Sequence, residues 1–316
     1  MGIQSILTSQ QISTFYLTLC IVLQGHGVLP RIEIAQSPGT RQSPVRTASQ
    51  SRKLFGIQLR PSAQALLSEV ENLYGKTVVE ADNTNSESKS ALGDAASNVL
   101  PDGAPVISIN VTSGKNEDSI VHELFHLKLF AQGHSTPPAI RIGNTGKTFD
   151  TGVIVHLIMG LVHGPLQHSL FFPEMRRMGF DPDGEQRETV LKAIRGGKFE
   201  VIEGLSAADR DRLLAMYFFE FSMHFTDVKL LSAMAGWFKN AGWIKPLAMG
   251  EAMVGVARKA YPYTPQTLID TFVRCLNVLY EGESQFTFDQ WVRRTASPLP
   301  IRIAVLNRLP VPPKNR

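Results

Sequence analysis

The chain has 316 residues, of which 43% are hydrophobic and 19% are charged, so it is large enough for one large globular domain or two modest ones. The formal net charge is only +4, and apart from Arg176–Arg177 and Arg293–Arg294 the basic residues are scattered. This composition argues against a nucleic-acid-binding protein. The two cysteines, Cys20 and Cys275, are not expected to form a disulfide bond, because Cys20 would leave with a signal peptide.

The first 56 residues differ in composition from the rest. An apolar run at 15–23 has the length of a signal-peptide core, and Ala35 is a small residue suited to a cleavage position. We expect a signal peptide over residues 1–35 and a disordered linker over 36–56, which predicts a secreted or periplasmic protein. No Lys or Arg precedes the apolar run, so a cytoplasmic protein with an amphipathic start is the alternative.

Residues 57–181 predict an α+β region. Apolar spacing favours a helix over 63–74, and a β-prone segment follows at 77–81. The polar stretch 82–104 is expected to be a loop, and 104–111 reads as a second strand. An apolar helix should follow, with Asn116 as its cap and acidic residues in its first turn.

That helix carries the sequence His122-Glu123-Leu124-Phe125-His126, an H-E-x-x-H motif. On a helix, positions i and i+4 share a face, so His122 and His126 can bind one metal ion together. Glu123 lies beside that face, where it can take a proton from a water molecule. Two imidazoles and an adjacent acid are typical of zinc hydrolases.

A strand leading into an H-E-x-x-H helix resembles the zincin metallopeptidases, and the resemblance covers residues 57–181. It implies a zinc ion held by His122, His126 and a third residue, with Glu123 as general base. It also implies a peptide or protein substrate paired with a strand beside the helix, which we expect to be the strand at 104–111. Lys128 departs from the apolar residue preferred in the extended motif.

The third ligand is expected on a second helix, as in the gluzincin branch, because Leu129 and Gln132 do not fit the metzincin spacing. We predict His168, placed just after a helix break at Gly164-Pro165 on a new, short helix. Two alternatives remain for this ligand. Glu174 and His163 are other candidate ligands, whereas His156 is expected in the core and His134 in a surface loop.

The apolar stretch 152–172 is long enough to span a bilayer, but its three histidines and central Gly-Pro favour a buried helix, so no membrane span is expected. Beyond residue 181 the pattern predicts an all-α region, 182–316, packed on the first. Expected helices cover 184–195, 206–225, 226–240, 248–260, 264–281 and 286–296. Tyr217, Glu220 and His224 share a helical face, which we interpret as a core face with hydrogen-bonded polar groups rather than an oxyanion-binding surface.

The sequence therefore predicts a mostly helical α+β protein with a zincin-like front half, a small β-sheet and an all-α back half. The function hypothesis is a zinc metallopeptidase with Glu123 as the catalytic residue and His122, His126 and His168 as metal ligands. A non-enzymatic protein with a structural or degenerate metal site is the alternative. A metal hydrolase acting on another kind of bond is a third possibility.

Overall fold

The computed structural model describes residues 52–82, 95–100, 102–110, 116–134, 139–142, 148–149, 157–196, 205–281, 284–293 and 301–310. The expected signal peptide at 1–35 lies outside these residues. The fold begins inside the expected linker, because β1 (Lys53–Leu54) pairs with β2 (Ile57–Gln58). Residues 53–56 therefore belong to the fold, and the expectation of a disordered linker is wrong for them.

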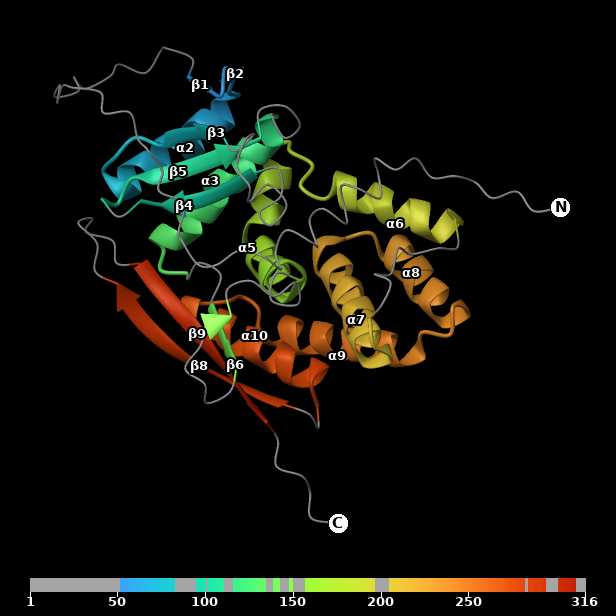
Figure 1. Ribbon diagram of the computed structural model, residues 1–316. Helices are drawn as coiled ribbons and strands as arrows, with labels where there is room; N and C mark the ends of the chain where they lie inside the picture. Colours follow the sequence, from blue (N-terminus) through green and yellow to red (C-terminus); the bar gives the residue numbers. More distant parts are fainter. Residues whose placement is uncertain are drawn as a thin grey trace.

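The front half of the chain forms a three-stranded sheet and two helices, which lie together at the upper left of Figure 1. The helices are α2 (Pro61–Tyr74) and the motif helix α3 (Glu117–Ala131). Helix α2 ends at Gly75, whose positive φ of 64° suits a residue without a side chain. The Tyr74 hydroxyl donates a buried hydrogen bond to the Leu127 carbonyl, 2.9 Å away, and so joins the two helices.

The sheet order is β3 (Val79–Asp82), β5 (Pro105–Ile109), β4 (Ala95–Val99). Strand β4 lies within the segment expected to be a loop. Strand β5 is the middle strand, parallel to β3 and antiparallel to β4, so its backbone is already paired on both sides. The expectation that a substrate strand pairs with 104–111 is therefore wrong. Strands β3 and β4 are the two edge strands of this sheet among the described residues, and β4 lies against α3.

Helix α5 (Gly164–Arg177) connects the front of the molecule with the back. It continues directly from a π-helical turn, η3 (Met159–His163), in which the Gly164 amide donates to the Met159 carbonyl. The expected break at Gly164-Pro165 is absent. A proline ring would clash with the carbonyl four residues earlier in a regular α-helix, and the wider π-turn relieves this clash. His168 and Glu174 thus lie on one continuous helix.

Five predicted helices of the back half are confirmed, with small differences at their ends. They are α6 (Gly184–Gly196), α7 (Ala207–His224), α8 (Val228–Asn240), α9 (Ile244–Ala260) and α10 (Pro265–Leu279). Polar caps explain where several begin: the side chains of Ser206, Asp227 and Thr264 accept hydrogen bonds from the first turns of α7, α8 and α10.

The expected helix at 286–296 is wrong, and the back half is not all-α. Residues Ser284–Arg293 form strand β8, which pairs in antiparallel register with β9 (Ile301–Pro310). The four-stranded sheet is completed by β6 (Ala139–Ile142) and β7 (Thr148–Phe149). Strands from both sides of residue 181 thus share one sheet. The mostly helical α+β class is confirmed.

Two hydrophobic cores meet at α5. The front core joins α2, α3 and β5 to Phe171, Phe172 and Met175 from the second half of α5. The back core joins α7, α9 and α10 to Val162 and Leu166, which lie in and just after η3. His168 lies between these two groups along the chain. Within the described residues, none of the helices combines the length and the apolar character that crossing a membrane requires.

Candidate metal centre

The motif histidines lie on one face of α3, as the spacing predicts. The Asn116 side chain caps the helix by accepting a 2.7 Å hydrogen bond from the Ser119 amide. One turn further along, the Nε2 atoms of His122 and His126 approach to 3.1 Å. Both imidazoles therefore direct the same ring nitrogen toward a common point.

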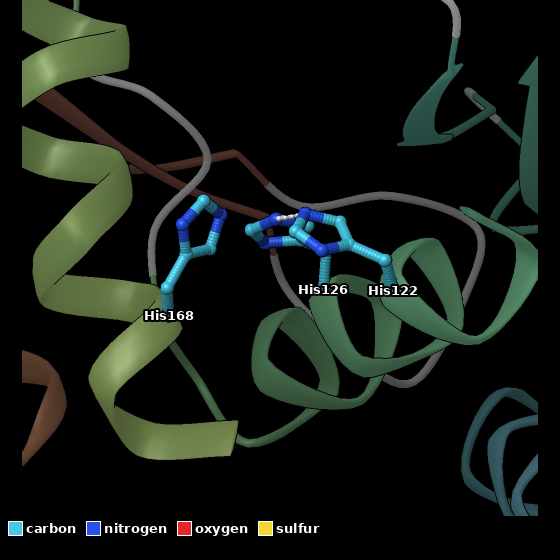
Figure 2. Close-up of side chains that lie close together, drawn as sticks. All are labelled: His122, His126 and His168. Atoms are coloured by element: carbon cyan, nitrogen blue, oxygen red, sulfur yellow. Dashed lines mark hydrogen bonds between the residues drawn. The ribbon is translucent and has the colours of Figure 1, made fainter. Parts of the chain in front are cut away.

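Helix α5 supplies the third imidazole. The rings of His168 and His122 have centroids 4.7 Å apart, and His168 and His126 are separated by 5.3 Å. One ligand nitrogen from each of the three histidines lies within 4.8 Å of the others. Figure 2 shows His168 opposite the α3 pair, with one ring nitrogen facing the pair and the other facing away. The choice of His168 over its alternatives thus agrees with the geometry.

The donor set fits a zinc ion. Two nitrogens bound to one tetrahedral zinc at about 2.0–2.1 Å lie about 3.3 Å apart, close to the 3.1 Å between the α3 pair. His168 needs a movement on the order of 1 Å toward the pair to complete such a site. Zinc binds neutral imidazole, and burial lowers the pKa of His122 to about 4 and those of His126 and His168 well below the usual value.

Glu123 is nearly inaccessible, with only 6% of its surface exposed. Burial raises the pKa of its carboxyl group to about 7, and a hydrogen bond from Ser97 on β4 opposes this rise. A carboxyl group poised near neutral pH can both accept and return a proton. Sequence reasoning missed Ser97, because nothing in the segment 82–104 indicated the strand that carries it.

Aromatic rings pack against the three histidines, which are partly buried. Phe171 packs edge-on against His122 and His126, and Phe172 stacks on His168 with ring centroids 4.7 Å apart. Phe125 stacks on Phe171 behind them. These apolar walls limit water around the imidazoles and so strengthen electrostatic interactions inside the site.

His224, at the end of α7, contacts His168, the third candidate ligand, directly. Its Nε2 atom is 2.9 Å from Nδ1 of His168. The guanidinium of Arg176 donates to the His224 backbone carbonyl at 2.7 Å, so α5 holds this residue at two points. The sequence placed His224 on a core face with hydrogen-bonded polar groups but gave no signal of its partner, which depends on how α5 packs on α7.

The other candidate ligands lie elsewhere. Glu174 forms an ion pair with Arg177 on the surface of α5. His163 is buried against Phe272, and neither of its ring nitrogens has a partner among the described residues. His134 is buried rather than in an exposed loop, contrary to expectation. His156 lies outside the described residues.

The other two polar residues of the α7 face, Tyr217 and Glu220, differ in their surroundings. Tyr217 stacks on Phe221 and packs against the hydrophobic residues around α7. Glu220, one turn before His224, has a pKa raised to about 8 by burial. The interpretation of this face as a core face with hydrogen-bonded polar groups agrees with the contact between His224 and His168.

Comparison of the chain with family models, with curated proteins and with solved structures gives no match.

Proposed function

We propose that the protein is a zinc-dependent hydrolase and, among hydrolases, a metallopeptidase. The observation that carries this proposal is the convergence of His122, His126 and His168 from two helices, with ligand nitrogens within 4.8 Å of one another. The acid of the motif, Glu123, lies on the same helix turn as His122. Three imidazoles with an adjacent acid are the donor set of a catalytic rather than a purely structural zinc site.

His122, His126 and His168 would hold the ion, which supplies Lewis-acid activation of water and of the scissile carbonyl. Glu123 accepts the proton of the attacking water on a carboxylate oxygen and then gives it to the leaving amine. Its pKa of about 7 in the metal-free protein suits both transfers near neutral pH. Phe171 and Phe172 exclude bulk water from the reacting groups.

The substrate class follows from the edge strand. Strand β4 leaves one edge unpaired among the described strands and lies against α3, and its Ser97 contacts Glu123. An extended peptide can add to such an edge through backbone hydrogen bonds, which would place a peptide bond beside the general base. The zincin resemblance leads us to expect the substrate strand in this position.

A non-enzymatic, structural metal site is the second candidate. A structural zinc site has four protein ligands and no open position. Within the described residues the ligand group has three members, and the nearby His224 is engaged with His168. This arrangement favours the hydrolase.

The test is zinc stoichiometry combined with cleavage of a peptide library by the full-length chain. We expect about one zinc per chain, lost in both His126→Ala and His168→Ala, and cleavage that a chelator abolishes. Glu174→Ala serves as the control on α5 and should keep its zinc. A wild-type chain that binds no zinc would overturn the proposal. Bound zinc without cleavage of peptides would support the structural site or a different substrate bond.

A further inference from the structure

We propose that His224 is a positioning residue, which fixes the tautomer and the ring orientation of His168 so that its Nε2 atom is presented to the metal. This inference rests on the proposed metal centre. It extends the centre to α7, a helix that contributes none of the three ligands. The carrying observation is the 2.9 Å contact between Nδ1 of His168 and Nε2 of His224.

Hydrogen-bond chemistry determines the roles of the two rings. A neutral imidazole has one N–H donor and one acceptor nitrogen. When Nε2 of His168 offers its lone pair to a metal, the proton of His168 is on Nδ1. Nε2 of His224 then accepts a hydrogen bond from this N–H group, with the proton of His224 on its own Nδ1. Metal binding through Nε2 of His168 and a hydrogen bond donated by Nδ1 of His168 to His224 therefore require the same tautomer of His168. Figure 2 shows the ring orientation that this arrangement needs, with one His168 nitrogen facing the α3 pair and the other turned away from it.

Several contacts keep His224 in place. Its backbone carbonyl accepts the 2.7 Å hydrogen bond from Arg176, and Arg176 also pairs with the buried carboxylate of Asp183 at 3.1 Å. The His224 ring lies against Phe172, with centroids 4.9 Å apart, and only 2% of the residue is exposed. Since Phe172 also stacks on His168, the two imidazoles share one aromatic wall. A fixed acceptor can orient its donor; a mobile one cannot.

His224 is better placed as a partner of His168 than as a fourth ligand. The nitrogen that it directs toward the centre is Nε2, and this atom already contacts Nδ1 of His168. The group of nitrogens within 4.8 Å of one another contains His122, His126 and His168 but not His224. Its role is therefore to orient a ligand.

The test compares His224→Leu with His224→Gln in the full-length chain. Both replacements approximate the volume of the imidazole, but only glutamine retains an acceptor for the His168 proton. We expect His224→Leu to weaken zinc affinity by about 10–100-fold, and His224→Gln to recover most of the loss. Thermal unfolding of the metal-free variants should be similar. Competition with a chromophoric chelator gives the affinities, and the visible spectrum of bound Co²⁺ reports the ligand geometry.

Three outcomes would overturn the inference. One is a His224→Leu variant with wild-type zinc affinity. Another is an equal loss in both variants that parallels an equal loss of stability in the metal-free protein. The third is a Co²⁺ spectrum in which His224→Gln loses one coordinated nitrogen, since His224 would then be a ligand itself. In each case wild-type zinc binding persists, so the proposed metal centre stands. Only a wild-type chain without zinc removes both proposals.

Discussion

Ser97, on the edge strand β4, is hydrogen-bonded to the carboxyl group of Glu123 on α3. This hydrogen bond links Glu123, the proposed general base, to the strand that we propose as the binding site of a peptide substrate. Ala95, Ser97 and Val99 lie on the same face of β4, because successive side chains of a strand point to opposite faces. Ala95 and Val99 pack against the front core. The position of Glu123 therefore depends on the register of β4 as well as on α3.

Replacing Glu123 with Gln should separate catalysis from metal binding. The amide has almost the same shape but cannot accept the proton, so we expect kcat to fall by about 10²–10⁴-fold. Zinc content, measured by atomic absorption, should stay at the wild-type level because the three imidazoles are unchanged. His122→Ala is the contrasting variant and should lose zinc and activity together. Unchanged turnover in Glu123→Gln would contradict the assigned role.

Removing the Ser97 hydroxyl should impair turnover more mildly. A single hydrogen bond to a carboxylate contributes about 1.5–3 kcal/mol at most, so Ser97→Ala should reduce kcat/KM by about tenfold with zinc affinity intact. Asn98→Ala is the matched control, since its side chain alternates to the opposite face of β4 and accepts from the Val99 amide. Equal effects of both substitutions on steady-state kinetics would indicate a general disturbance of the strand.

Glu220 should make the protein less stable as the pH rises. Burial raises its folded-state pKa to about 8, above the unfolded value. Between about pH 4.5 and pH 8 the unfolded chain thus loses its proton while the folded chain keeps it, and the free energy of unfolding falls. Glu220→Gln removes this dependence. The free energy of unfolding of the variant, relative to that of the wild type, should therefore rise across that interval and stay constant above it. Urea denaturation at pH 5 and pH 9 measures the difference; identical pH profiles for both proteins would refute the assignment.

Gly250 marks a close approach of α9 to α7. A Cβ atom at this position would lie 2.8 Å from Cδ1 of Phe218 and 3.0 Å from the Ala215 carbonyl oxygen. Because one of these atoms is backbone, Gly250→Ala should destabilise the protein by about 1–3 kcal/mol. Gly255, also on α9, has no atom within 4 Å of such a Cβ, so Gly255→Ala should stabilise by up to about 1 kcal/mol. Chemical denaturation of the two variants should give shifts of opposite sign.

The helices and the two candidate ligands on α3 could be predicted because their signals are local. Apolar spacing and capping residues define α7 and α10, and one helical turn separates His122 from His126. The choice of His168 also needed little more than residue type and a second helix. The pairing of His168 with His224 could not be predicted, since it arises only when α5 packs on α7.

The sequence-based predictions that differ from the structure fail for specific local reasons. Phe286 and Phe288 alternate with Gln285, Thr287 and Asp289, a two-residue period that indicates the observed strand rather than the expected helix. Strand β4 is composed of Ala, Ser, Asn and Val, whose average β propensity is low, and its pairing with β5 outweighs that preference. Pro165 does not end its helix, because the π-turn before it accommodates the ring.

Helix α5 contributes side chains to the front core and to the back core, so the proposed metal centre lies where these two cores meet. An ion held by His122 and His126 on α3 and by His168 on α5 would link the front core to the helix that continues into the back core. Metal binding would then depend on the packing of both cores, since loosening either core moves the ligands apart and lowers the affinity for the metal. Substitutions deep in the back core, distant from every ligand, should on this reasoning act as modulators of metal affinity.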